Sequence, residues 1–471
     1  MASLTSKQWR RVVLGCPLAW SHIHVSILPK QVVEENDPEW CIEEDYLEWL
    51  SSPRGKARPL DLWAERADAS TLSLSVRAAC TVPHIEVNIA NTIRALHSHF
   101  HKFRHLHLVT DTAVFEDVLV TLFSGVTTTW ESIQLALDRR LDRSSHIAGM
   151  MSDSHVEIPK LWASLRNSTK LRTLSFRRCL PILPEEHQGG ASRLRSLSIV
   201  NVDCDYGRML QILSHCPNLS TLHLSVCPPS ASSATAQVAE PSADTHLSPV
   251  PLPATPIFFP SLSRLSMHQM DTESCQIILQ HIKTPILSFF SLWNHGLSEI
   301  EGRIMAGEKT YDIMAPFGEA VVTFAAQASQ LRTFHITNSA LPDRHLLQVL
   351  GHMESLEELR LKRMNIGGLL FRGLSRATKP IASRPVLCRS LRRLSLFGCE
   401  FVTDDHLEDL IFARSARRSL TVPISFLEVD RCKNVTQEGM RDLKEEDPSL
   451  NCTIVRGQED EVEVEVEVDE S

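Results

Sequence analysis

The densest group of potential ligand residues is a histidine run in the segment HSHFHKFRHLHL, and imidazole nitrogen is a common zinc ligand. Five histidines fall within eleven residues: His97, His99, His101, His105 and His107. Alternate residues share a face only on a strand, whereas the stripe of Ile93, Leu96 and Phe100 indicates that the first three histidines end a helix. No cysteine is close in sequence. The spacing therefore predicts no metal site, and His105 and His107 instead fit the outward positions of a strand.

The sequence contains none of the common catalytic or nucleotide-binding motifs. It lacks the phosphate loop G-x-x-x-x-G-K-[ST], the dinucleotide motif G-x-G-x-x-G, the nucleophile elbow G-x-S-x-G and the zinc-protease motif H-E-x-x-H. The pair Gly367-Gly368 predicts a turn rather than a phosphate cradle. We therefore expect a protein that is not an enzyme, with no cofactor and no small-molecule substrate.

The net charge of -9 is concentrated at one end of the chain. Residues 458–471 hold eight acids and no Lys or Arg, so residues 1–457 carry only -9 + 8 = -1. A nearly neutral body has no general field to attract nucleic-acid phosphates or an anionic membrane. We therefore expect no nucleic-acid ligand and no membrane partner.

Cysteine usage and apolar runs indicate the compartment. Twelve cysteines are spread from Cys16 to Cys452 without a C-x-x-C pair, which predicts reduced thiols rather than a disulfide framework. Residues 1–11 lack the apolar core of a signal peptide, and nowhere do eighteen apolar residues run together. The expected location is the cytoplasm, the nucleus or both.

The elements that position these residues follow a repeated pattern, Leu-x-x-Leu-x-Leu with conservative replacements. Copies begin at Leu171, Leu194, Leu219, Leu262, Leu287, Leu331, Leu356, Leu391 and Ile424, with weaker ones at Phe103 and Trp130. Several copies start 23 or 25 residues apart, which is the length of one leucine-rich repeat, and intervals of 41, 43 and 44 residues indicate insertions. Between copies, helical spacing over 209–213, 275–282 and 346–350 predicts that each unit is a strand followed by a helix.

Stacking such units predicts an α/β fold, an irregular leucine-rich-repeat solenoid with parallel strands inside and helices outside. Motif positions one, four and six point into the core, while positions three, five and seven project from the other side of the sheet. Helices are wider than the strand spacing of about 4.8 Å, so the stack curves and leaves a concave sheet face open to a partner.

The same register assigns arginine, histidine and aromatic side chains to the concave face. The candidate partner-binding residues are His223, Arg264, His268, Trp293, His335, Arg360, Arg393 and Phe397. Because aromatic residues and arginine dominate the energetics of protein interfaces, this composition favours a protein partner. RNA bound by the same arginines and histidines is a further alternative, and it predicts a steep salt dependence of binding.

The last repeats resemble the cysteine-containing class of the leucine-rich-repeat superfamily. The copy from Leu391 ends in Cys399 and is followed by Val402-Thr403-Asp404, and the next copy ends in Cys432 and is followed by Val435-Thr436. The resemblance covers roughly residues 100–455. It implies that these cysteines are small packing residues in a tight turn, and that the threonine or aspartate caps a helix.

The N-terminal segment KQWRRVVLGCPLAWSHIHVSI carries a different pattern. A helical stripe from Trp9 to Cys16 is followed by a proline and an extended run. This segment resembles the second half of a fungal F-box-like domain, whose last helix reads Trp-Arg-x-hydrophobic-hydrophobic before a proline turn and Leu-x-Trp. Residues 60–67 and 72–76 are also similar to the segments after that domain in the family, whereas its opening Leu-Pro-x-Glu segment has no counterpart in residues 1–8.

The resemblance implies a non-catalytic substrate receptor of a Skp-cullin-F-box type ubiquitin ligase. The F-box-like part would hold the Skp-type adaptor, and the concave repeat face would hold an unidentified target protein. The implied adaptor-binding residues are Trp9, Val12, Val13, Pro17, Leu18 and Trp20. The alternative is a free-standing leucine-rich-repeat scaffold, in which the N-terminal helix caps the first apolar edge of the stack.

These patterns divide the chain into four parts. Residues 1–30 are the F-box-like remnant, 31–100 a connecting and capping region of helices and strands, 101–455 the solenoid, and 456–471 an acidic tail. Pro, Ser and Ala fill 19 of 33 positions in 228–260, which predicts a disordered insertion, either a spacer or a phosphorylated loop. The tail alternates Glu with Val, and we expect it to be disordered and solvated, or to bind a basic partner.

Overall fold

A computed structural model describes most of the repeat region and parts of the N-terminal region. The described residues are 21–27, 67, 71–78, 101–110, 129–137, 156–158, 170–181, 193–204, 206–227, 251–294, 310–339, 341–375, 387–415 and 421–455. The chain divides into two compact units, residues 1–257 and 258–471. Among the described residues, no helix is both long and apolar enough to cross a membrane.

Seven parallel strands form the main sheet of the first unit. In spatial order they are β1 (His22–Ile27), β2 (Leu72–Ala78), β3 (Phe103–Thr110), β4 (Ser132–Leu137), β6 (Thr173–Arg177), β8 (Ser196–Asp203) and β9 (Thr221–Cys227). Helix α9 (Tyr206–Ser214) lies between β8 and β9 in the chain. Strands β5 (Val156–Ile158) and β7 (Cys179–Pro181) pair separately.

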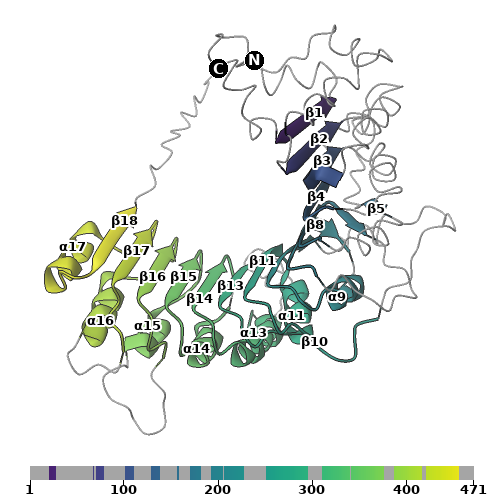
Figure 1. Cartoon of the computed structure of the whole chain (residues 1–471). Helices are drawn as coiled ribbons and strands as arrows, with labels where there is room; N and C mark the ends of the chain where they lie inside the picture. Colours follow the sequence, from purple (N-terminus) through teal and green to yellow (C-terminus); the bar gives the residue numbers. More distant parts are fainter. Residues whose placement is uncertain are drawn as a thin grey trace, which may run out of the picture. The chain divides into compact units, whose positions relative to one another are not determined.

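The second unit repeats the same plan with seven parallel strands. They are β11 (Arg264–Met270), β13 (Phe289–Asn294), β14 (Thr333–Thr337), β15 (Glu358–Lys362), β16 (Arg393–Phe397), β17 (Phe426–Asp430) and β18 (Asn451–Val455). The helices lie together on one side of this sheet (Figure 1): α11 (Thr272–His281), α13 (Thr310–Gln327), α14 (Asp343–Gly351), α15 (Gly368–Ser375), α16 (Asp404–Ser415) and α17 (Gln437–Glu446). Short strands β10 (Ile257–Phe258) and β12 (Ile282–Lys283) flank β11 and α11 in the chain.

This architecture confirms the predicted α/β leucine-rich-repeat solenoid. All eleven motif copies form strands, and the three segments with helical spacing lie in α9, α11 and α14, except that Ile282 follows α11 and begins β12. The parallel sheet also contains β1, β2 and β18, which were not among the eleven copies. In β2 the alternation of buried Leu72, Leu74 and Val76 explains why this segment joins the sheet.

The core lies between the sheet and the helices, where motif positions one, four and six are buried. In the repeat that starts at Leu331, Leu331, Phe334 and Ile336 are all 0% exposed. The ring of Phe334 stacks on Phe290 of β13, with centroids 5.6 Å apart, and Phe290 also contacts Phe324 of α13 at 5.1 Å. These contacts hold the helix layer against the sheet, since dispersion and burial of large rings contribute strongly to packing.

Position eight has a left-handed backbone in seven of the eleven motif copies, and it follows the end of the strand in five of them and forms a bulge within β8 and β11 in the other two. The residue there has a positive φ in Arg178, Asn201, Gln269, Asn338, Arg363, Gly398 and Arg431. Its N–H still extends the sheet: the Arg363 N–H donates to the Phe397 carbonyl (2.6 Å) and the Gly398 N–H to the Asp430 carbonyl (2.8 Å). The left-handed conformation then turns the chain from the sheet towards the helix layer, although it costs a non-glycine residue about 1–2 kcal/mol.

Cysteines follow this turn directly, at motif position nine. The thiols of Cys399 and Cys432 lie 3.6 and 3.7 Å from the carbonyl oxygens of Leu361 and Leu396, one strand back, to which they donate weak hydrogen bonds. Both side chains are buried and free of disulfides, as is Cys179, whose pKa burial raises to about 12. The cysteines are packing residues, as the sequence predicts.

Side chains also cap helices across neighbouring repeats. Both carboxylate oxygens of Asp404, the first residue of α16, accept hydrogen bonds from Thr436, one from its N–H (3.0 Å) and one from its hydroxyl (2.7 Å). Thr436 in turn caps α17 by accepting from the Gly439 N–H (2.9 Å). The Val-Thr-Asp run therefore starts its own helix and also fixes the start of the next one.

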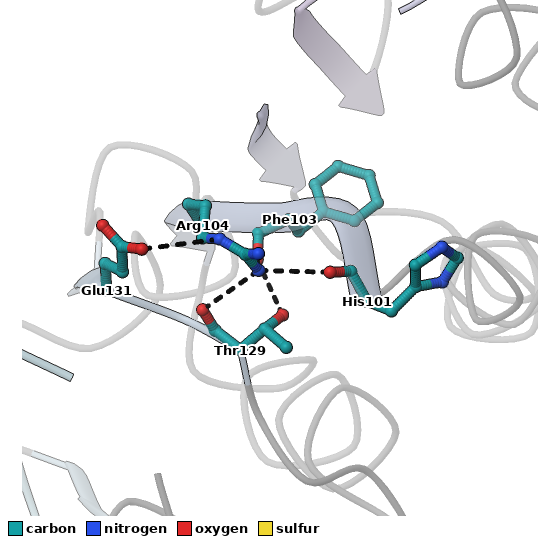
Figure 2. Close-up of polar contacts among 5 residues, drawn as sticks. All are labelled: His101, Phe103, Arg104, Thr129 and Glu131. Carbon is teal, nitrogen blue, oxygen red and sulfur yellow. Dashed lines mark hydrogen bonds and ion pairs between the residues drawn. The ribbon is translucent and has the colours of Figure 1, made fainter. Parts of the chain in front are cut away.

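The side chain of Arg104 links β3 and β4 in a similar way (Figure 2). Its guanidinium donates to the carbonyls of His101, Phe103 and Thr129 at 3.1–3.4 Å, and its Nε lies 3.4 Å from the Glu131 carboxylate. The Thr129 hydroxyl also donates to the Phe103 carbonyl (2.9 Å). One side chain thus satisfies backbone acceptors at the starts of both β3 and β4.

Two sequence-based boundaries look different in the structure. The predicted disordered insertion 228–260 is wrong at its end, because Phe259 is fully buried and its N–H donates to the Lys283 carbonyl (2.9 Å). The apolar run Ile257-Phe258-Phe259 gives this end the buried surface that the average composition of the segment concealed. Residues 228–250 lie outside the described residues. Strand β1 falls within the F-box-like segment 1–30 and pairs in parallel with β2.

Replacing Gly398 by alanine should lower the free energy of unfolding by about 1 kcal/mol, because an L side chain is strained at its φ of +59°. The added Cβ makes only an ordinary van der Waals contact, 3.5 Å from Arg363 Cγ. The loss of stability therefore measures the strain of the backbone conformation. Urea unfolding of the full chain measures it. The matched change Arg431→Gly relieves the same strain (φ +52°) and should cost nothing; equal losses in both variants would contradict this view of the turn.

Replacing Arg104 by methionine should destabilise the first unit by roughly 1.5–3 kcal/mol, because several backbone acceptors lose a charged donor. Glu131 is too exposed for the ion pair itself to contribute much. The measurement is thermal unfolding followed by tryptophan fluorescence, since Trp130 packs on Phe103. Arg172→Met is the control, because Arg172 occupies the same motif position but is exposed; a similar loss there would show a non-specific effect of removing charge.

Candidate functional site

The candidate site is the face of the second unit's sheet that points away from its helices, which we call the open face. It consists of motif positions three, five and seven, and the parallel register aligns these positions in three rows across the strands. Row three contains Arg264, Phe289, Thr333, Glu358, Arg393 and Phe426. Row five contains Ser266, Ser291, His335, Arg360, Ser395 and Glu428. Row seven contains His268, Trp293, Thr337, Lys362, Phe397 and Asp430.

Three arginines of the open face each lie over an aromatic ring of the next strand. The guanidinium carbon is 4.6 Å from the ring centroid for Arg264 over Phe289, 5.4 Å for Arg360 over Phe397, and 5.2 Å for Arg393 over Phe426. Such stacking uses the face of the guanidinium and leaves the N–H groups around its edge available for hydrogen bonds. The arginines are therefore held in place before any ligand binds, which lowers the entropy cost of binding.

Two of the three acidic residues in these rows have partners within the face, whereas Asp430 lies 4.0 Å from Arg431 in the adjoining turn. Glu358 lies 3.0 Å from His335 Nε2, and Glu428 accepts a hydrogen bond of 3.0 Å from the Ser395 hydroxyl. Among the described residues, no carboxylate forms an ion pair with Arg264, Arg360 or Arg393. The part of the open face from β11 to β16 therefore presents positive charge to a ligand.

His335 sits at the centre of this arrangement. Its ring and that of Phe289 meet edge to face, with centroids 5.3 Å apart, and its side chain is only 18% exposed. Burial lowers the pKa of His335, Glu358 opposes this by accepting its hydrogen bond, and the nearby Arg360 lowers the pKa further. The neutral imidazole is thus the form that the folded chain favours.

A second histidine sits near the edge of the face. His268 Nε2 lies 3.1 Å from the Ser291 hydroxyl, and its ring centroid is 6.1 Å from that of Trp293. Trp293 is half-buried. A half-buried tryptophan beside polar groups is typical of residues that anchor protein interfaces.

The structure places the eight expected partner-binding residues on outward strand positions. Seven of them lie on the open face: Arg264, His268, Trp293, His335, Arg360, Arg393 and Phe397. His223 lies in the first unit, on β9 beside Ser198 of β8, and burial lowers its pKa. Whether these residues bind a partner remains a proposal.

The sequence-based set omitted three residues that organise the open face. Phe426 supports Arg393, Glu358 binds His335, and Ser395 binds Glu428. All three occupy position three or five of motif copies that the sequence shows, so the register alone contained the signal. The expected set contained only residues whose own chemistry suits an interface. These three residues were left out because their role is to hold other side chains.

The remaining candidate residues divide into two groups. Trp9, Val12, Val13, Pro17, Leu18 and Trp20, the implied adaptor-binding residues, lie outside the described residues. His105 and His107 are exposed on β3, at the outward positions predicted for them, while His97 and His99 lie outside the described residues. In the described part of the chain, no three His, Cys, Asp or Glu residues lie where they could hold a metal ion.

Comparison with known proteins gives structural similarity only. No protein-family model and no curated protein sequence matches the chain. Among solved structures, an internalin from Listeria monocytogenes matches with a TM-score of 0.36 and 10% identity, over 84% of this chain and 83% of the internalin. A chain from the crystal structure of the Rad7 and Elc1 complex in yeast matches with a TM-score of 0.34 and 14% identity, over 84% of this chain and 71% of the other.

The lowered pKa of His335 predicts a loss of stability in mild acid. Its folded pKa lies below the ordinary 6.5, so protonation favours the unfolded chain, and stability falls as the pH drops through about 6.5 towards the folded value. His335→Gln keeps a donor for Glu358 but cannot titrate, so its free energy of unfolding should change less between about pH 7.5 and about pH 5.5. Denaturant unfolding at both pH values measures this. His352→Gln, at an exposed histidine, is the control; an unchanged pH dependence in His335→Gln would contradict the prediction.

Proposed function

We propose that this chain is a non-catalytic protein-binding receptor whose partner docks on the open face. The observation that carries the proposal is the set of three arginines held over aromatic rings, at Arg264, Arg360 and Arg393. Arginine and aromatic residues are the side chains that contribute most to protein interfaces. Repeat architectures commonly use such extended sheet surfaces for binding.

The chemistry of the open face favours a protein ligand with carboxylates and exposed apolar side chains. Fixed guanidinium groups bind carboxylates through directed, charge-assisted hydrogen bonds. Trp293 and Phe397, both half-buried, offer apolar surface within the same rows. A ligand that combines both features gains from desolvation and from electrostatic complementarity.

Substitutions on the open face should weaken binding of the partner without unfolding the chain. Quantitative affinity purification compares the full chain with Arg393→Ala and with Trp293→Ala, and any protein lost from both variants is then produced and its Kd measured. We expect at least about tenfold weaker binding, as for residues central to an interface. Arg344→Ala, at an exposed arginine on α14, is the matched control on the helix side. If Arg344→Ala loses the same proteins, or the open-face variants lose none, the open face is not the docking site.

We further propose that residues 9–20 hold a Skp-type adaptor, so that the chain delivers its partner to a cullin-RING ubiquitin ligase in the cytoplasm or nucleus. Support comes from the resemblance of this segment to the second half of an F-box-like domain. The residues assigned to the adaptor are those of its Trp-Arg-x-Val-Val helix and the Leu-x-Trp run after Pro17.

Co-purification with a Skp-type adaptor tests the ligase part separately. The full chain should recover the adaptor, and Val13→Asp should abolish recovery because a carboxylate replaces an apolar contact. The open-face variant Arg393→Ala should retain the adaptor, since it alters the other binding surface. A wild-type chain that recovers no adaptor would leave the free-standing scaffold as the function.

A further inference from the structure

A strip of cations lies at the carboxyl ends of strands β15 and β17. Lys362 ends β15, Arg363 occupies the left-handed turn after it, and Arg431 occupies the same turn after β17; all three are exposed. We call these three residues the basic edge. Among the described residues, the side chains of Lys362 and Arg363 have neither an ion pair nor a hydrogen bond. Arg431 Nε lies 4.0 Å from the Asp430 carboxylate, so the positive charge of the basic edge that nothing in the described structure neutralises is that of Lys362 and Arg363.

Arg360 lies in row five, two residues before Lys362 on β15, and in the part of the chain that the structure describes its guanidinium also lacks a hydrogen-bond partner. Its Nε is buried but makes no hydrogen bond within the described structure. Buried N–H groups in proteins nearly always have an acceptor, so an acceptor from elsewhere is expected here. The Phe397 ring supports the guanidinium from one side and offers apolar surface between Arg360 and the basic edge.

The ligand that fits this chemistry is an extended acidic segment that also carries apolar side chains. Carboxylates would meet Arg360, Lys362 and Arg363, and apolar side chains would cover Phe397. Residues 458–471 of this chain contain eight acids and no Lys or Arg, and from Glu461 to Val468 they alternate strictly between Glu and Val. In an extended conformation this alternation directs carboxylates to one side and valines to the other.

The reach of the acidic tail agrees with this assignment. Strand β18 ends at Val455, and parallel strands place their carboxyl ends at the same edge, so the chain leaves the sheet at the edge where Lys362 and Arg363 lie. Three strand spacings separate β18 from β15, which is about 14 Å. Four extended residues span about 13 Å and the glutamate side chain adds to this length, so the acids from Glu459 onward come within reach of β15.

We propose that residues 458–471 bind the basic edge and Arg360 of the same chain. Exposed ion pairs are weak individually, but a short tether gives an effective concentration of about millimolar, so several weak pairs suffice. Bound there, the tail covers part of the open face and competes with an external partner, a consequence that rests on the proposed function. The tail is then an internal competitor at the partner site.

Carbodiimide cross-linking of the full chain tests the contact directly. The reagent activates a carboxylate, which the Lys362 amine attacks to form an amide, and mass spectrometry identifies the joined peptides. Cross-links from residues 459–465 to Lys362 should exceed those to Lys444 by at least about tenfold. Lys444 is exposed on α17, the element before β18, so it is closer to the tail along the chain than Lys362 but lies on the helix side. In about 1 M salt the Lys362 product should fall steeply, because the Debye length shrinks to about 3 Å.

A variant and a labelling experiment complete the test. Arg360→Gln with Arg363→Gln should reduce cross-linking at Lys362 several-fold without removing the lysine. Mixing isotope-labelled with unlabelled chain should give products within one chain only. Equal yields at Lys362 and Lys444, insensitivity to salt, or products only between chains would overturn the proposal. None of these readouts needs a partner, so a failure of the tail contact and a failure of the proposed function are distinguishable.

Discussion

The parallel register of the strands is the constraint on which every other feature depends. Because each repeat pairs with the next without a shift over motif positions three to seven, as from β13 to β18, positions four and six fall in the core and positions three, five and seven form straight rows. The left-handed turn at position eight preserves this register: its N–H still bonds to the next strand, and the chain then leaves for the helix layer. A slip of one residue would exchange core and surface in that repeat.

The register also explains which parts of the fold and of the site the sequence predicts. The apolar positions of each copy determine the strands, and helical spacing determines α9, α11 and α14, because both patterns reflect burial. It was harder to foresee that Phe426 supports Arg393, or that Asp404 holds Thr436, the N-cap of the next helix, because these contacts join residues 32 or 33 positions apart. The apolar end of the insertion, at Phe259, was hidden by the composition of the residues before it.

The open face shows how a regular scaffold produces a specific surface. The rows are geometrically equivalent, so their chemistry is set by the side chains that neighbouring repeats place side by side. Arginine beside an aromatic ring gives a fixed cation, histidine beside glutamate gives a partly buried neutral imidazole bonded to a carboxylate, and serine beside glutamate satisfies a carboxylate. Glu358 and Glu428 thus have partners within the face, while the stacked arginines keep the edges of their guanidinium groups for a ligand.

The most direct test of the open face is hydroxyl-radical footprinting of the full chain with and without its bound partner. Oxidation of Trp293, Phe397 and Phe426 should fall when the partner binds, because it covers the rows that hold them. Phe412 on α16, which is 71% exposed on the helix side, should be oxidised equally in both states. Protection of Phe412 with unchanged oxidation of the open-face rings would place the partner on the helices and contradict the account.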